Sequence, residues 1–278
     1  MFGKLLKHDL RATGRIIPII LGTALLMAFL AFLPLLFNDS PGILRALLGT
    51  MLGFCLVIVP VLTYVFLVMH FYKSSYGANA YLTRTLPVSQ RKVYYSKLLI
   101  ALFWMLLAML VSGIMLISLI ALIGSGLEGI PAIEEELGSI GQQLSDFFPT
   151  STKVLVAIFL PLYLLLTILQ WVLLYQFCFC AGNLGPFRRM GVASPLLIYA
   201  IYYVAEQVLS TLSTLVPLQV GLNEQGYIVF SFHNYYQSLA NQEMVVGMPV
   251  LPLILAPLLC LAAFFLCRRW YAKSINLR

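Results

Sequence analysis

Six long apolar stretches constrain this sequence more than any other feature. Each can form a helix that crosses the ~30 Å hydrocarbon core of a bilayer, which takes about 20 mostly apolar residues. With 61% hydrophobic and 10% charged residues, a soluble domain of 278 residues could not cover its surface with polar groups. The sequence therefore predicts an all-α, polytopic membrane protein and excludes soluble enzymes, disordered chains and disulfide-rich secreted modules. The expected spans are residues 16–37, 46–70, 98–123, 154–182, 195–220 and 249–267.

The positive charges predict how these spans are oriented. Of the 17 Lys and Arg residues, 15 lie in the N-terminal segment, in 71–97, in 183–194 or at the C-terminal end. Eight of the ten acidic residues lie in the segments that connect the spans on the opposite side. Cytoplasmic loops of membrane proteins carry the excess of Lys and Arg. Both termini are therefore expected in the cytoplasm, with outer segments at 124–153 and 221–248.

The N-terminal residues 1–15 have the pattern of an amphipathic helix. Phe2, Leu5, Leu6 and Leu10 fall on one side, and basic residues occupy the rest. Such a helix lies in the plane of the membrane surface. The alternative interpretation is a charged flank that only sets the topology. We expect an interfacial helix over 1–15, followed by a single six-helix transmembrane domain over 16–278.

The two outer segments are expected to be partly helical. Apolar residues recur every three or four positions in 124–153, which indicates a short surface helix. Segment 221–248 is too polar to span and is predicted to form two short helices dipping into the outer leaflet. His233 has no second His or Cys near it in sequence, and the five cysteines lie in apolar runs. We expect no catalytic, metal or cofactor site in this chain.

The cytoplasmic segment 71–97 combines a basic rim with an apolar centre. Tyr81, Leu82, Thr85 and Leu86 share one face of a predicted short helix. Pro87 ends that helix, because the residue before a proline disfavours the helical conformation. Ser89 is then placed to cap a following helix that starts near Arg91. This pattern predicts a surface that docks into a groove on a cytosolic partner. The alternative is a turn whose apolar side chains rest on lipid headgroups.

Two stretches of the chain resemble a known family. Tyr81-Leu82-Thr83-Arg84-Thr85-Leu86-Pro87-Val88-Ser89, with Lys97 opening the next span, is similar to the loop after the second helix in permease subunits of ATP-binding-cassette (ABC) exporters. The class is the type-2, O-antigen-exporter-like one. The opening Phe2–Thr13 resembles the N-terminal elbow helix of Gram-positive bacterial members. Six spans with both termini inside match the same plan.

The resemblance implies a transport subunit of a larger complex in a bacterial plasma membrane. Its cytoplasmic loop would be a coupling helix that docks on a cytosolic ABC ATPase, two copies of which are expected per complex, beside a second permease subunit, identical or homologous. ATP and Mg would bind the ATPase, because this chain has no G-x-x-x-x-G-K-[ST] phosphate loop. The chain itself would be no enzyme and would contact lipids but no nucleic acid. The implied coupling residues are Tyr81, Leu82, Arg84, Thr85, Leu86, Pro87 and Val88.

Polar residues of the fifth predicted span recur every three or four positions, which places them on one helical face. They are Tyr199, Tyr203, Glu206, Ser210, Ser213 and Pro217. A carboxylate in mid-membrane normally faces the protein interior or a wet cavity. The fourth span offers a weaker partner face in Tyr163, Thr167 and Gln170. We expect this stripe to line a transport pathway or the seam between two permeases. The alternative is hydrogen bonding between helices as ordinary packing.

Other function classes stay open at the level of sequence. An ATP-independent secondary transporter or a membrane assembly factor would use the same spans. An intramembrane enzyme is less well supported, because the chain has neither H-E-x-x-H nor G-x-S-x-G. No residue pattern indicates which substrate is transported. None indicates whether the second permease is an identical copy or a different chain.

Overall fold

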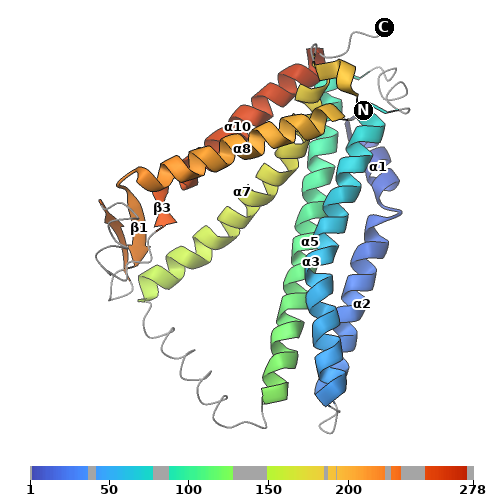
Figure 1. Ribbon diagram of the computed structural model, residues 1–278. Coiled ribbons are helices and arrows are strands. Elements are labelled where there is room, and N and C mark those ends of the chain that lie inside the picture. The colour runs from blue at the N-terminus through green and yellow to red at the C-terminus, as the bar shows by residue number, and fades with distance from the viewer. Residues whose placement is uncertain are drawn as a thin grey trace. The chain divides into compact units, whose positions relative to one another are not determined.

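The computed structural model describes residues 2–36, 42–77, 88–127, 149–184, 187–191, 193–222, 227–232 and 248–273. The chain divides into two compact units, Met1–Ser139 and Ile140–Arg278. Most described residues are helical (Figure 1). Within the described residues, five helices are long and apolar enough to cross a membrane, and a sixth span results if the first two helices are counted as one bent span. This confirms the prediction of a polytopic helical membrane protein. The single domain over 16–278 stays a prediction.

The first unit is a bundle of long helices that run side by side (Figure 1). Buried alanines on α2, namely Ala24, Ala28 and Ala31, are spaced by four and three residues and allow close approach of the neighbouring helices. Ala101 and Ala108 do the same on α5. The elements of this unit are α1 (Phe2–Thr13), α2 (Ile17–Leu36), α3 (Gly42–Ser75) and α5 (Gln90–Leu127).

The N-terminal helix α1 is joined to α2 through a bend. It ends at Thr13, two residues earlier than the predicted helix over 1–15, and its axis is bent by 55° from that of α2. Leu5 is buried, whereas Phe2 and Leu10 on the same predicted apolar side are exposed within the unit. The helix at these positions agrees with the sequence pattern. Its position on the membrane surface stays a prediction.

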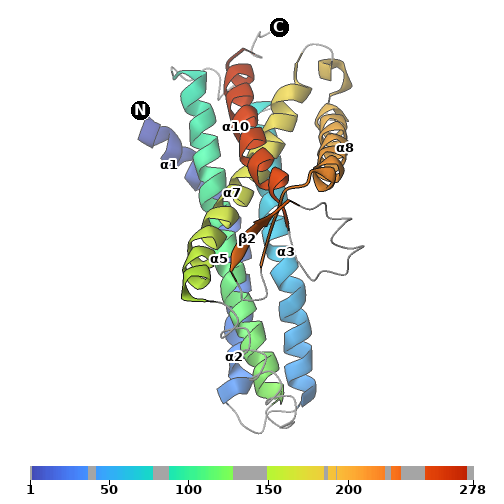
Figure 2. The same ribbon diagram turned by 90° about the vertical axis from the view of Figure 1, so that its left-hand side faces the viewer.

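The second unit joins three α-helices and one short 3-10 helix to a small sheet. Its helices are α7 (Thr150–Gly182), η1 (Phe187–Met190), α8 (Ala193–Leu215) and α10 (Val250–Lys273). Its antiparallel sheet has the order β2-β1-β3, with β1 (Gln219–Leu222), β2 (Ile228–Ser231) and β3 (Met248–Pro249). α7 packs against both α8 and α10 (Figure 2).

A compact core holds this unit together near the carboxyl end of α7. Cys178 and Ala181 of α7 are buried against Ile198 of α8. Phe177 and Trp270 pack on this core with their ring centroids 5.6 Å apart, so α10 is fixed to the same place. Towards its amino end, α7 diverges from α8 and α10 (Figure 1), and its first half is largely exposed within the unit.

The expectation of two short helices in 221–248 is wrong for the part that the structure describes. Strands occupy this region instead, and α8 ends at Leu215, before the predicted limit of 220. Pro217 lies beyond the helix, because a proline cannot donate the backbone hydrogen bond that would continue it. The β-branched residues Val220, Ile228 and Val229 then favour strands. His233 lies outside the described residues. Most of the segment 124–153, for which a short helix was predicted, also lies outside them.

The helix before the predicted coupling loop extends further than expected, and the helix after it starts close to the predicted position. α3 continues to Ser75, five residues beyond the predicted end of the second span at residue 70, and α5 begins at Gln90, where a helix from about Arg91 was predicted. The Val93 backbone N–H donates to the Ser89 carbonyl at 3.4 Å, and Lys92 donates to the same carbonyl at 2.9 Å. Ser89 therefore holds the N-cap position, as predicted, and the helix starts one residue before Arg91.

Candidate functional site

The predicted coupling residues are only partly covered by the structure. Tyr81, Leu82, Arg84, Thr85, Leu86 and Pro87 lie outside the described residues. Val88 is described and half-buried immediately before α5. The site on this side is therefore built from the helices that carry the loop.

A buried polar cluster joins α1, α3 and α5 beside this loop. The Ser96 hydroxyl donates to Asp9 Oδ2 at 3.0 Å, which links α5 to α1. Lys97 Nζ donates to the Ser74 hydroxyl and so links α5 to α3. Lys97 is only 6% exposed and interacts electrostatically with Asp9. We call Asp9, Ser74, Ser96 and Lys97 the Asp9–Lys97 cluster.

A second buried hydrogen bond lies one helical turn away from this cluster. Trp104 Nε1 donates to Thr13 Oγ1 at 2.8 Å, and both residues are buried. Thr13 Oγ1 in turn donates to the Asp9 carbonyl at 3.0 Å. The end of α1 is thus fastened to α5 at two levels.

The chemistry of the Asp9–Lys97 cluster is that of a joint between helices. Its opposite charges and hydroxyls satisfy one another in a largely buried site, where an unpaired charge is costly. Asp9 is the one acidic residue in the segments that the sequence predicts to be cytoplasmic. A single acid among basic residues was the available signal that Asp9 pairs with a specific side chain. Sequence reasoning placed Lys97 at the entrance of a span but missed its partners on α1 and α3.

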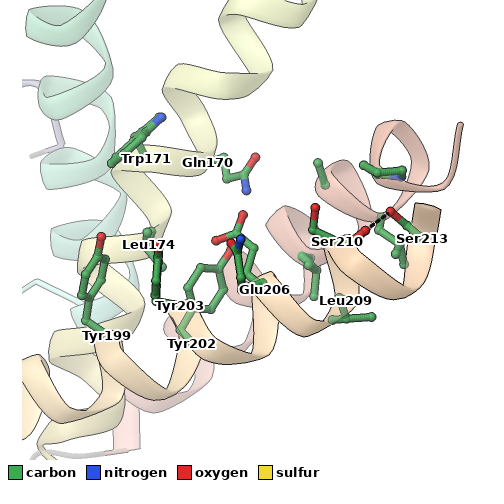
Figure 3. A pocket seen from close by; sticks show the side chains of 15 residues that line it. Gln170, Trp171, Leu174, Tyr199, Tyr202, Tyr203, Glu206, Leu209, Ser210 and Ser213 are labelled. Carbon is green, nitrogen blue, oxygen red and sulfur yellow. Dashed lines mark hydrogen bonds between the residues drawn. The ribbon is translucent and has the colours of Figure 1, made fainter. Parts of the chain in front are cut away.

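The second unit contains a cavity of about 460 Å³ between α7, α8 and α10 (Figure 3). It lies where α7 diverges from α8 and α10. The structure brings together most of the residues that the sequence proposed for a pathway or seam. Pro217 at the end of the stripe, and Tyr163 and Thr167 of the partner face, do not line this cavity. Those that line the cavity are Gln170, Tyr199, Tyr203, Glu206, Ser210 and Ser213.

Glu206 occupies the middle of α8 and faces this cavity. It is 13 residues from the start of a 23-residue helix, or about 20 Å along an axis of about 34 Å. Its side chain and that of Gln170 on α7 point toward each other across the cavity (Figure 3). Tyr202 lines the same cavity and interacts with Gln170 and Glu206. Among the described residues, none forms an ion pair with Glu206.

Two hydroxyl groups, one on α8 and one on α7, bond within their own helix. They therefore give limited support to a role in packing the helices against each other. Ser213 is buried and donates to the Ser210 carbonyl of its own helix at 2.6 Å. On α7, Thr167 likewise donates to the Tyr163 carbonyl at 2.8 Å. These bonds stay within one helix and do not join α7 to α8.

Sequence reasoning missed the rest of the cavity wall. Trp171 and Tyr202 are direct neighbours in sequence of predicted residues, and their aromatic rings at those positions were the available signal. The wall contributed by α10 is apolar and includes Pro252, Leu255 and Leu259. Such residues do not differ from ordinary lipid-facing residues in a sequence.

The described residues show no arrangement suited to binding a metal ion. Within the described ranges, no group of three or more His, Cys, Asp or Glu side chains lies close enough together. The five cysteines, all of them within the described residues, form no disulfide. The cavity therefore offers one carboxylate among neutral polar and aromatic groups.

Comparisons with known proteins add no identification. No family model matches the chain, and no curated protein or solved structure matches it either. The function proposed below therefore depends on the residues and their geometry.

Proposed function

We propose that this chain is the permease subunit of an ABC exporter in a bacterial plasma membrane. A separate cytosolic ATPase subunit would dock on the loop between α3 and α5 and supply the energy of ATP hydrolysis. A second permease, identical or homologous, would complete the transport path. The resemblance of 81–89 and Phe2–Thr13 to this family suggests the assignment, and the helices around the loop support it.

The observation that carries the proposal is how α3 and α5 hold the loop. α3 has 34 residues and α5 has 38, which correspond to about 51 and 57 Å of helix. A bilayer is about 40–45 Å thick including its headgroups. Both helices can therefore project beyond the membrane and present the segment 76–89, which contains Arg84, to a cytosolic partner. A force on this segment would act directly on two spans.

The Asp9–Lys97 cluster supports the same mechanism. Lys97 lies on α5, about one helical turn beyond Val93. It joins α5 to Ser74 near the end of α3. Displacement of the loop would therefore move both helices together. α1 would follow, because Asp9 and Thr13 bind the buried face of α5.

The test is capture of the tagged full chain from native membranes in mild detergent. The wild type should bring a cytosolic ATPase with it, and Leu86→Asp should lose that ATPase, because a charge replaces an apolar docking residue. Ser89→Asp is the matched control. It adds the same charge three residues away, and Asp preserves the N-cap of α5.

Each outcome distinguishes between function classes. An ATPase that is lost with Leu86→Asp and retained with Ser89→Asp supports the proposal and the docking site. An ATPase retained by both variants keeps the class but contradicts the docking site. A well-folded wild-type chain that captures no ATPase overturns the proposal in favour of a secondary transporter or assembly factor.

A further inference from the structure

The cavity beside Glu206 carries a negative charge that its own wall does not neutralise. None of the residues that line it is a Lys, Arg or His. Glu206 is exposed within the unit, although a carboxylate in mid-membrane costs about 2.5–3.5 kcal/mol on insertion scales. A helix that places such a group in the membrane needs a compensating partner at that position.

The aromatic residues around Glu206 indicate what kind of partner fits. Tyr199, Tyr203 and Trp171 line the same cavity and are 43%, 56% and 48% exposed, so part of each side chain is accessible to a ligand. Aromatic faces attract cations, and most strongly where water is excluded. The charge and the rings therefore favour the same class of ligand.

The size and composition of the cavity distinguish an organic cation from a metal ion. Its volume of about 460 Å³ falls in the range of about 300–1,000 Å³ that is typical of small-molecule sites. Within the described residues, the ligand set of a metal ion is missing. The α10 wall of Pro252, Leu255 and Leu259 offers contact for an apolar body.

We propose that this cavity binds a hydrophobic organic cation, with Glu206 paired to the charge and the rings of Tyr199, Tyr203 and Trp171 against the apolar body. Gln170 faces Glu206 from α7 and supplies a neutral polar contact on the opposite wall (Figure 3). That this ligand is the exported cargo rests on the proposed function. The binding site itself does not depend on an ATPase.

The test uses two probes of matched shape and opposite charge, tetraphenylphosphonium and tetraphenylborate. Binding is measured by equilibrium dialysis to the purified full chain in nanodiscs of neutral lipid. The wild type should bind the phosphonium cation, and Glu206→Gln should weaken that binding about tenfold or more, which corresponds to about 1.4 kcal/mol. Glu206→Asp should retain part of the affinity. Val204→Ala is the control, because Val204 lies on α8 outside the cavity lining and is 61% exposed.

A fold check accompanies each variant. Glu206→Gln should leave the thermal stability unchanged or raised, because it removes a charge that no described residue pairs. Rhodamine 6G serves as a second cation of different shape. Should Glu206→Gln fail to fold, Tyr203→Leu replaces it, with the same expected loss of cation binding.

Three results would overturn the proposal. The first is that neither cation shows binding that depends on Glu206 or Tyr203. The second is that the borate anion binds as tightly as the phosphonium cation, which indicates partition into an apolar surface. The third is that Glu206→Gln dissociates an oligomer without changing cation binding, which assigns the residue to a contact between subunits. ATPase capture is measured separately, so failure of the ABC assignment leaves this result interpretable.

Discussion

Trp104 Nε1 donates a hydrogen bond of 2.8 Å to Thr13 Oγ1, and this bond joins the last residue of α1 to the buried face of α5. The partners are 91 positions apart in sequence. A helix of 12 residues is too short to be stable in isolation. Long-range bonds of this kind therefore hold α1 in place.

Thr13→Val should destabilise the first unit, because it leaves the buried indole N–H of Trp104 without its acceptor. The expected loss is about 1–3 kcal/mol, and it should appear as a lower midpoint in a thermal unfolding assay in detergent. Thr50→Val is the matched control. The Thr50 hydroxyl is exposed and donates only to the Leu47 carbonyl of its own helix. Equal losses for both variants would contradict a specific role for the Trp104–Thr13 bond.

Asp9→Asn should also destabilise the first unit. The amide can still accept from Ser96, but the buried ammonium of Lys97 loses the charge that stabilises it. We expect a loss of about 2 kcal/mol or more. The control is Lys7→Gln, a charge change at an exposed position of the same helix, which should have little effect.

A double-mutant cycle checks that Asp9 and Lys97 act together. Lys97→Met should cost less in the Asp9→Asn background than in the wild type, by about 0.5 kcal/mol or more. Strictly additive losses would show that the two charges are energetically independent.

Gly182→Ala should destabilise the junction between α7 and α8 in the second unit. An added Cβ would lie 2.8 Å from Ser194 Oγ and 3.0 Å from the Pro195 backbone nitrogen, and a backbone atom cannot easily move away. Gly113→Ala in α5 is the control, because nothing lies within 4 Å of its added Cβ. Alanine there should be neutral or stabilise the helix by up to about 1 kcal/mol. Thermal unfolding of both variants measures the difference, and equal effects would contradict close packing at Gly182.

Much of the helical architecture was predictable because long apolar runs have few alternatives. The start of α5 was predicted to within one residue, since Pro87 and Ser89 give local signals that do not depend on the rest of the fold. The α8 stripe was predictable for the same reason. Spacings of three and four residues place Tyr199, Tyr203 and Glu206 on one face of any helix.

The remaining features depend on contacts between distant segments. Lys97 is a basic residue like many others at a span entrance, and only the packing of α1 and α3 against α5 shows that it is buried. The strands after Pro217 were missed because the helical and strand patterns of short polar segments overlap. The apolar α10 wall of the cavity, including Leu255, has no distinguishing sequence signal at all.

The meeting point of α7 and α8 at Gly182 has a mechanical consequence. The core around Cys178 and Ile198 fixes α7 to α8 at one end only, whereas the pairing of β1 with β3 joins the far end of α8 to the start of α10. Pivoting against α7 near that core, α8 and α10 would form one lever arm of about 34 Å. A rotation of about 10° there moves the far end of α8 by about 6 Å, by the same helix dimensions. Glu206, about 20 Å along the arm, moves by about 3.5 Å. A displacement of this size is enough to make or break its contact with a ligand, while the packing at the pivot remains intact.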